Sequence, residues 1–249
     1  MSFVSGFHPV RETLLQRPKA VESVLLQKDR KDARMKELET LARQNGVPVR
    51  QVPKEELDRL GGKAHNGVVA KVATRELDSV EACLAGEPGS RIVVFLDEVT
   101  DPGNVGAIVR TAAALGASVV LTERHSAALG ETVAKAAAGA LERVRIGRAG
   151  NAARFLEDAK KAGFWVFGAA MEGEPASRVD LTGDVVLCLG AEGEGLRRLT
   201  KETCDRLVSI PMVGGGGSLN VSVAAAILLW EVRRTRIGHE NGLTAGGPR

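Results

Sequence analysis

Three loops rich in glycine and polar residues each follow a short apolar stretch typical of a buried strand. They occupy residues 97–106, 190–195 and 210–222. Strands that alternate with helices predict a parallel sheet, and the loops at the carboxyl ends of its strands lie at one edge, where α/β folds bind ligands. The three loops therefore predict a single ligand site built from distant parts of the chain.

The first loop contains an Asp-Pro-Gly turn that ends at Asn104, and we expect Asn104 to cap the helix that follows. Arg110 lies on that helix. Its neighbours three and four positions away are all small: Gly106, Ala107, Ala113 and Ala114. A cation on so bare a surface leaves room for a ligand or a second chain, and the alternative is an ordinary surface arginine paired with a carboxylate.

The second loop begins at Gly190 and has the spacing GxxGxG. A dinucleotide loop has the spacing GxGxxG, and the carboxylates of Glu192 and Glu194 would repel a pyrophosphate. We therefore expect a ligand without phosphate, or a cationic one. A plain turn between a strand and a helix is the alternative, although such turns seldom need three glycines.

The third loop contains four consecutive glycines, residues 214–217, which permit unusual backbone angles and close approach. Ser218, Asn220 and Ser222 then crowd the start of a helix. One of the three suffices as an N-cap, so the others are free to contact a ligand. The alternative is a flexible loop with a redundant cap.

The charge is unevenly distributed along the 249 residues. Residues 1–75 contain 15 Lys and Arg against 9 Asp and Glu, whereas the remainder contains 19 against 22. The basic N-terminal third predicts contact with a polyanion, with a merely solvated basic surface as the alternative. The chain has six Phe, two Trp and no Tyr. We therefore expect contacts to RNA phosphate and shape rather than rows of stacked aromatic side chains.

Several classes of protein are excluded by composition. The longest apolar run, residues 223–230, is too short to span a bilayer, so no membrane association is expected. The N-terminus has neither the basic start nor the apolar segment of a signal peptide. Three widely separated cysteines predict a reducing cytoplasm, and four scattered histidines predict no metal.

Hydrophobic periodicity predicts two segments of α/β type. In the first, strands are expected at 21–26, from 47 and at 67–72, with helices at 10–15, 33–45 and 54–60. In the second, strands are expected at 92–96, 118–121, 143–146, 165–169, 185–189 and 207–210, with helices at 105–115, 131–140, 152–162, 196–204 and 220–234. The predicted domains are residues 1–74 and 91–236, joined by a linker at 75–90 that includes a short helix and followed by a loose tail at 237–249.

Taken together, the loops resemble the three motifs of the SpoU class of SPOUT RNA methyltransferases. The matching residues are Asp101-Pro-Gly-Asn104-Val-Gly with Arg110, then Leu189-Gly190-Ala-Glu192-Gly-Glu-Gly195, then Ile210-Pro-Met with Ser218-Leu-Asn220-Val-Ser-Val-Ala. The likeness covers residues 91–236. Gly6-Phe-His8-Pro-Val and Ala64-His65-Asn66-Gly67-Val-Val-Ala-Lys-Val resemble the family's small substrate-binding domain, which is similar to ribosomal protein L30e.

The resemblance implies a parallel-sheet SPOUT domain with a deep trefoil knot, an L30e-like α/β domain before it, and a homodimer. It implies S-adenosylmethionine as the methyl donor and the ribose 2′-hydroxyl of a guanosine in 23S ribosomal RNA as the acceptor. The implied catalytic residues are Arg110, Asn104, Glu192, Ser218 and Asn220, and the implied cofactor-binding residues are Gly190, Ile210 and Leu219. Arg110 would act either as the general base or as a cation that binds phosphate and stabilises a developing alkoxide; a free guanidinium keeps its proton.

Three other functions stay open from the sequence. They are ribose methylation of transfer RNA within the same family, RNA binding without catalysis, and nicotinamide-dependent oxidation and reduction. The basic N-terminal domain favours ribosomal RNA, because the smallest tRNA-modifying members of the family lack that domain. The intact set of motif residues disfavours a non-catalytic protein, and the spacing of the second loop disfavours a nicotinamide cofactor.

Overall fold

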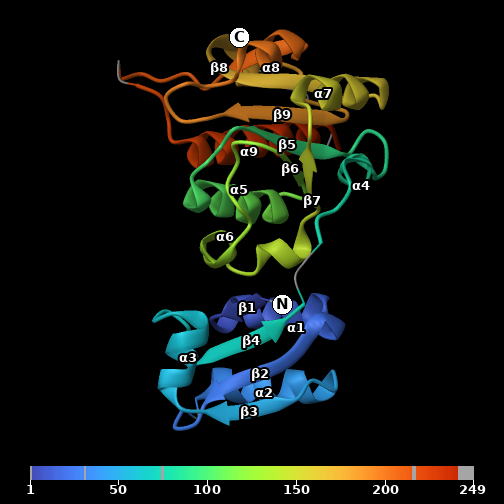
Figure 1. The fold of residues 1–249 in the computed structure, drawn as a ribbon. Coiled ribbons are helices and arrows are strands. Elements are labelled where there is room, and N and C mark those ends of the chain that lie inside the picture. The colour runs from blue at the N-terminus through green and yellow to red at the C-terminus, as the bar shows by residue number, and fades with distance from the viewer. Residues whose placement is uncertain (1, 31, 74–75, 215–216, 241–249) are drawn as a thin grey trace. The chain divides into compact units, whose positions relative to one another are not determined.

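The computed structural model describes residues 2–30, 32–73, 76–214 and 217–240. The chain divides into two compact units, each with its own sheet (Figure 1). Met1–Glu76 and Ala128–Arg143 form the N-terminal unit, and Leu77–Ala127 and Val144–Arg249 form the C-terminal unit.

A four-stranded sheet in the order β1-β4-β2-β3 organises the N-terminal unit. β4 is antiparallel to β1 and β2, and β3 is parallel to β2. Its elements are β1 (Ser2–Ser5), α1 (Phe7–Gln16), η1 (Pro18–Ala20), β2 (Val21–Gln27), α2 (Ala33–Gln44), β3 (Val49–Val52), α3 (Lys54–Gly61), β4 (Val68–Val72), α6 (Glu131–Ala137) and η2 (Ala140–Arg143). Asp32 caps α2 by accepting a hydrogen bond from the Met35 amide at 3.1 Å, and Met35, Leu38 and Ala42 then pack into the core.

A six-stranded parallel sheet organises the C-terminal unit, as the sequence predicts. The strand order is β10-β8-β9-β5-β6-β7. The strands are β5 (Ile92–Asp97), β6 (Ser118–Thr122), β7 (Ile146–Ala149), β8 (Trp165–Pro175), β9 (Val185–Gly190) and β10 (Arg206–Ser209). Every residue of the central strand β5 is buried, because helices cover both faces of the sheet.

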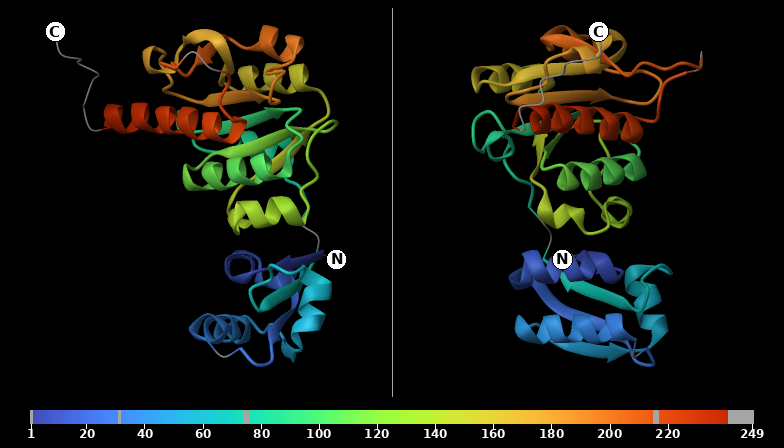
Figure 2. Two further views of the ribbon diagram at one scale, coloured as in Figure 1. Left: turned by 90° about the vertical axis from the view of Figure 1, so that its left-hand side faces the viewer. Right: turned by 180° about the vertical axis from the view of Figure 1, so that it is seen from behind.

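The helices of this unit are α4 (Val80–Leu84), α5 (Pro102–Ala114), α7 (Ala152–Lys161), α8 (Arg198–Thr203) and α9 (Val221–Glu240), with the short η3 (Ala176–Arg178). α5 and α9 lie together on one face of the sheet, and α4 and α7 lie on the other (Figures 1 and 2). Phe95, Phe155 and Leu156 form part of the core on the α7 side. Cys83 of α4 joins that core, although α4 falls in the predicted linker.

Some predicted boundaries are wrong. β7 begins at Ile146 instead of residue 143, and residues 140–143 form η2. α6 ends at Ala137 because Ala138 adopts a left-handed conformation with a φ of 49°. β8 continues to Pro175, well beyond the predicted end at residue 169. α9 extends through Glu240, four residues into the predicted tail, and residues 241–249 lie outside the described residues.

The pairing of β8 with β10 is interrupted in a way that shapes the site. Phe167 and Gly168 pair with the first two residues of β10, and Glu174 and Pro175 pair with the last two. Residues 169–173 therefore have no partner on β10 and leave the ladder as a bulge. A bulge of this kind redirects side chains that would otherwise follow the pleat.

Candidate functional site

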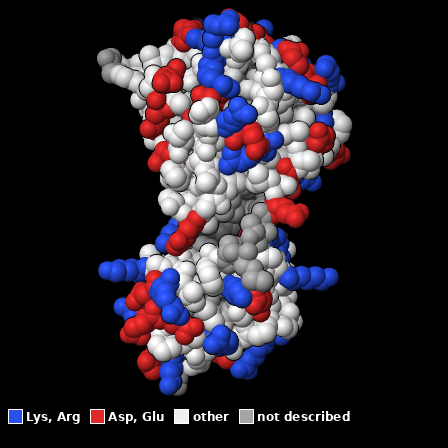
Figure 3. Space-filling view, in the orientation of Figure 1, with Lys and Arg blue, Asp and Glu red and all other residues white. Residues whose placement is uncertain are grey.

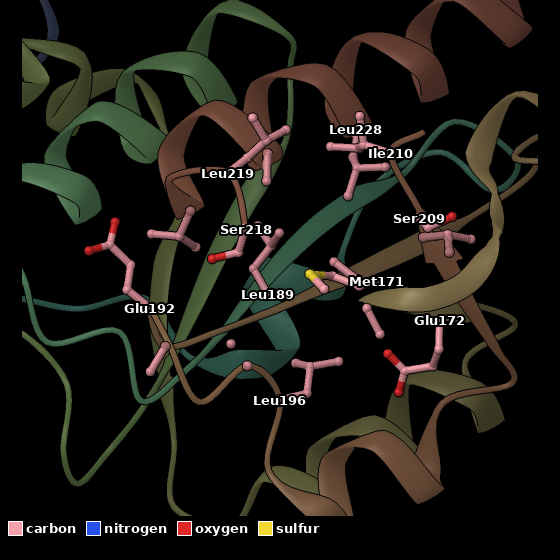
Figure 4. A pocket seen from close by; sticks show the side chains of 18 of the residues that line it. Met171, Glu172, Leu189, Glu192, Leu196, Ser209, Ile210, Ser218, Leu219 and Leu228 are labelled. Atoms are coloured by element: carbon pink, nitrogen blue, oxygen red, sulfur yellow. The ribbon is translucent and has the colours of Figure 1, made fainter. Parts of the chain in front are cut away.

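A pocket of about 530 Å³ lies at the carboxyl ends of β9 and β10 and beside the bulge of β8 (Figure 4). Its walls come from the bulge of β8, residues 189–196, residues 208–212, residues 218–219 and the first turns of α9. The volume is within the range of small-molecule sites, and Leu189, Leu196, Ile210 and Leu228 make much of the lining apolar. The second and third predicted loops therefore do form one site.

All three predicted cofactor-binding residues line this pocket: Gly190, Ile210 and Leu219. Gly190 is there for a steric reason. A Cβ atom on Gly190 would lie 2.0 Å from the carbonyl carbon of Gly195, because the loop folds back on itself. Gly195 donates its amide to the Ala191 carbonyl at 2.9 Å, which closes the loop.

One residue from each motif joins a small side-chain network. The Asn104 amide donates to Glu192 Oε1 at 3.0 Å, and the Asn220 amide donates to the same oxygen at 2.5 Å. Asn220 also donates to Asn104 Oδ1 at 2.9 Å. We call Asn104, Glu192 and Asn220 the motif ring. It fixes the three loops to one another, and its member Glu192 reaches the pocket wall.

Asn220 is oriented by the helix that it caps. Its Oδ1 accepts the Ser222 backbone amide at 2.9 Å and the Ser222 hydroxyl at 2.6 Å. If the amide group were reversed, its NH₂ would face these donors, so the carbonyl must point to the helix and the NH₂ to the motif ring. The prediction that one of the crowded polar residues caps the helix is confirmed, and the cap is also a member of the ring.

The prediction that Asn104 caps the following helix is wrong. α5 begins at Pro102, and Asp101 is its cap, accepting the Asn104 backbone amide at 2.7 Å. Proline at the first helical position loses no hydrogen bond there. Because Asp101 takes the capping role, the side chain of Asn104 is available to the motif ring.

Ser218 and Arg110 are the remaining predicted catalytic residues. Ser218 lines the pocket near Glu192 (Figure 4). Arg110 is exposed on α5 and belongs neither to the pocket lining nor to the motif ring. It lies six residues after Asn104, about 9 Å further along the helix axis. Within the part of the chain that the structure describes, no ion pair involves Arg110, so its positive charge faces solvent.

A buried carboxylate that sequence reasoning missed anchors the second loop. Asp97, at the end of β5, is fully buried and accepts the Arg197 backbone amide and the Arg197 Nε, both at 3.0 Å. Arg197 also pairs with Glu98 at 2.9 Å. These contacts tie the end of the loop to the central strand. In the sequence, the sole indication of this anchor is the acidic pair Asp97 and Glu98, which directly follows the apolar run at residues 92–96.

A second ion pair, at residues that no sequence motif includes, lies at the pocket itself. Glu172, in the bulge of β8, lines the pocket and forms an ion pair with Lys201 of α8. The hydrogen bond from Lys201 lowers the pKa of the Glu172 carboxyl. Cys188 lies within β9 in the core, and burial raises the pKa of its thiol well above the usual value. That thiol is therefore neutral and unsuited to nucleophilic chemistry.

The described segments contain no group of three or more His, Cys, Asp or Glu side chains that could hold a metal ion. None of their helices is long and apolar enough to cross a membrane.

The parallel sheet, the pocket walled by glycine loops and the motif ring define a methyltransferase of the SpoU type. Residues 91–230 match the SpoU rRNA methylase family, and residues 3–78 match the family described as RNA 2′-O ribose methyltransferase substrate binding. The chain belongs to the SpoU rRNA methylase family.

Individual relatives agree with this assignment. The chain is 42% identical over 242 residues to the 23S rRNA (guanosine-2′-O-)-methyltransferase RlmB of Xanthomonas campestris pv. campestris, a match that covers 95% of this chain and 97% of that one. The crystal structure of the SpoU methyltransferase AviRb from Streptomyces viridochromogenes, in complex with the cofactor AdoMet, superposes with a TM-score of 0.81 at 25% identity, covering 95% of this chain and 90% of AviRb. The A. aeolicus TrmH/SpoU tRNA modifying enzyme gives 0.54 at 32% identity, covering 66% and 83%.

Proposed function

We propose that this protein transfers a methyl group from S-adenosylmethionine to the ribose 2′-hydroxyl of a guanosine in 23S ribosomal RNA. The observation that carries the proposal is the motif ring, which joins all three motifs at the wall of a cofactor-sized pocket. The 42% identity to a 23S rRNA guanosine methyltransferase over nearly the whole chain supports the acceptor.

The pocket suits S-adenosylmethionine in shape and charge. Leu189, Ile210 and Leu228 offer apolar surface to an adenine ring, and Gly190 lets a ligand approach the backbone closely. Three carboxylates line the pocket: Glu172, Glu192 and Glu194. They favour a cationic sulfonium compound and disfavour a phosphorylated cofactor. Gly190, Ile210 and Leu219 would hold the cofactor, which when bound supplies a methyl group on an activated leaving group.

The residues around the pocket have three tasks in the proposed reaction. The motif ring holds the loops in a fixed geometry, so that the acceptor oxygen and the methyl carbon lie in line. Ser218, at the pocket wall, would use its hydroxyl to orient the ribose of the acceptor nucleotide. Arg110 presents an exposed cation that would bind the phosphate of the target nucleotide and stabilise negative charge on the 2′-oxygen as its proton leaves.

The N-terminal domain, predicted at residues 1–74, would bind the RNA, with residues 75–90 as the linker and 91–236 as the catalytic domain. The match of residues 3–78 to a substrate-binding family and the excess of basic residues support this role. In the view of Figure 3, Lys and Arg side chains are spread over the N-terminal unit among Asp and Glu, without a single patch.

A homodimer and a trefoil knot complete the proposal. Val223, Ile227 and Trp230 of α9 are 46%, 40% and 54% exposed and repeat at helical spacing, so they form an apolar stripe on the surface. A second copy of the chain would cover this stripe.

Three free cysteines and an RNA substrate of the ribosome favour the cytoplasm as the place of action.

The test is methyl transfer from labelled S-adenosylmethionine to purified 23S ribosomal RNA and, separately, to transfer RNA. We expect label in 23S RNA at a single guanosine, resistant to alkaline cleavage on its 3′ side because the 2′-oxygen is blocked. Label in transfer RNA alone would support the tRNA alternative, as does the likeness to the A. aeolicus enzyme. Cofactor and RNA binding without transfer would identify a non-catalytic protein.

A further inference from the structure

Glu172 is a charged group in the pocket that none of the three motifs includes. It lies in the five-residue bulge of β8, residues 169–173, and its side chain is 57% exposed. In Figure 4, Glu172 lies at one end of the pocket and Glu192 at the other. The two carboxylates therefore face different parts of any ligand that fills the space between them.

The bulge that carries Glu172 is held in a defined shape. A Cβ atom on Gly173 would lie 2.6 Å from backbone atoms of Leu207 and Val208, so the two strands approach more closely than a side chain would allow. The Ser209 hydroxyl donates to the Gly173 carbonyl at 2.7 Å. Glu172 is thus presented to the pocket by a fixed backbone and not by a free loop.

The position of Glu172 determines which part of the cofactor it meets. In the proposed function the motif ring, which includes Glu192, aligns the reacting groups, so the methyl group would lie at the Glu192 end. In S-adenosylmethionine the sulfur is bonded to the ribose C5′, and the nucleoside extends away from it. The nucleoside would therefore extend toward Glu172, and apolar residues such as Ile210 and Leu228 would hold its base.

We propose that Glu172 is a cofactor-recognition residue whose carboxylate accepts hydrogen bonds from the 2′- and 3′-hydroxyls of the ribose of S-adenosylmethionine. This inference rests on the proposed function and adds a residue to its cofactor site. A carboxylate suits a vicinal diol because its two oxygens can each accept one hydroxyl. The same logic places an acidic residue on the ribose in dinucleotide-binding folds.

Lys201 acts as a positioning residue for Glu172. It comes from α8, which packs beside β8, and its ammonium forms an ion pair with the carboxylate. The ion pair keeps the carboxylate deprotonated, since it lowers the pKa of Glu172. A deprotonated carboxylate accepts hydrogen bonds without donating any, which matches two hydroxyl donors.

The test is isothermal titration calorimetry of the full chain with S-adenosylhomocysteine and with its 2′,3′-dideoxyribose analogue. Wild-type protein should bind the analogue at least tenfold more weakly, which is the size expected for losing hydrogen bonds to a charged acceptor. Glu172→Ala should bind S-adenosylhomocysteine about as weakly as wild type binds the analogue, and it should no longer distinguish the two. Lys201→Met should retain part of the discrimination.

Glu174→Ala is the matched control. Glu174 is the next acidic residue on β8, is similarly exposed and pairs with Arg206 at 3.7 Å, but it is not part of the pocket lining. This variant should bind both ligands as wild type does. Thermal melts of each variant would show that the fold is retained.

A third ligand, 5′-methylthioadenosine, distinguishes the two ends of the cofactor because it retains the ribose and lacks the amino-acid part. Glu172→Ala should weaken its binding by the same factor as for S-adenosylhomocysteine. Unchanged binding of 5′-methylthioadenosine would assign Glu172 to the amino group and overturn the inference, as would a variant that still discriminates against the dideoxy analogue. Wild-type protein that binds none of the ligands would instead overturn the proposed function and this inference with it.

Discussion

Asn220 donates its side-chain amide to Glu192 Oε1 at 2.5 Å, and this bond joins the third motif to the second across 28 positions of sequence. The same amide reaches Asn104 Oδ1 at 2.9 Å, 116 positions away. Asn220 therefore contacts both of the other motifs, and the direct bond from Asn104 to Glu192 closes the ring. Because its Oδ1 also caps α9, the position of the whole helix is coupled to the pocket wall.

Replacing Asn220 by Asp should impair catalysis and leave the fold intact. Asp retains an oxygen that can cap α9, but it places a second carboxylate oxygen against Glu192 where an NH₂ stood. Like charges at this distance repel, so the ring should open. We expect methyl transfer to fall about a hundredfold, the size typical of a displacement of about 1 Å at a reacting centre. Single-turnover methyl transfer beside a thermal melt would measure both effects.

Asn151→Asp is the matched control for Asn220→Asp. Asn151 caps α7 in the same manner, accepting the Arg154 amide at 2.9 Å, and has no part in the pocket or the motif ring. Activity should stay at the wild-type level in this variant. If the two variants had equal activity, the motif ring would have no catalytic importance.

Gly190→Ala should abolish cofactor binding. The added Cβ would lie 2.0 Å from the Gly195 backbone, a clash that the loop can relieve only by moving away from the pocket. We expect no measurable S-adenosylhomocysteine binding by calorimetry. Gly150→Ala serves as the control, because nothing lies within 4 Å of a Cβ at that position, and its stability should change by under about 0.5 kcal/mol. Wild-type affinity in Gly190→Ala would contradict the closed loop.

The secondary structure that depends on local pattern could be predicted from the sequence. The apolar run at β5 and the periodic helices agree with the structure within a few residues, and the parallel sheet is confirmed. β1 was missed because Ser2–Ser5 is short and forms only by pairing with β4. β7 was misplaced because its pairing with β6 sets its position, while the alternating residues 143–146 suggested a strand three positions too early.

Membership of the candidate site could be predicted better than its geometry. The resemblance to the SpoU motifs identified five of the pocket residues and two further members of the motif ring: Gly190, Glu192, Ile210, Ser218, Leu219, Asn104 and Asn220. The start of α5 was misjudged, although Asp101 followed by Pro102 is itself a helix-start signal. Glu172 carried no signal, because its approach to the pocket depends on a bulge set by β10.

Neutralising lysines of the N-terminal unit should weaken RNA binding in a salt-dependent way. Lys54 begins α3 and Lys63 follows its end, and both are exposed. In Lys54→Gln/Lys63→Gln, the slope of log affinity against log salt should fall by about one for each RNA phosphate that the variant no longer neutralises. Lys161→Gln/Arg154→Gln on α7 removes the same charge from exposed sites of the C-terminal unit and should leave the slope unchanged. Equal slopes for both variants would argue against RNA binding by the N-terminal unit.

Introducing charge into the apolar stripe of α9 should dissociate the proposed homodimer. Ile227 and Trp230 are 40% and 54% exposed, so Ile227→Glu and Trp230→Glu cause no burial of charge in a monomer. Analytical ultracentrifugation should show a dimer for wild type and a monomer for each variant. Leu199→Glu, at an exposed apolar residue of α8, is the control and should stay dimeric. A wild-type protein that sediments as a monomer would refute the dimer.

Arg110→Ala should remove activity without destabilising the protein. Arg110 is exposed, its nearest helical neighbours are small, and no ion pair is found for it among the residues that the structure describes. An exposed helical site of this kind changes the free energy of unfolding by under about 0.5 kcal/mol. Loss of a group that stabilises charge in a transition state costs roughly a hundredfold or more in rate. Arg154→Ala, at an 84% exposed arginine on α7, should affect neither quantity.

Arg110→Lys separates the two roles proposed for the guanidinium. Lysine retains the positive charge but not the planar, bidentate donor group. If Arg110 binds a phosphate and stabilises the developing alkoxide, lysine should restore part of the rate that alanine loses. If Arg110 removes the 2′-hydroxyl proton, the rate of Arg110→Lys should instead depend on pH differently from wild type, because an ammonium titrates below a guanidinium. Single-turnover rates across pH, compared with thermal melts, measure both effects, and a wild-type rate in Arg110→Ala would exclude either role.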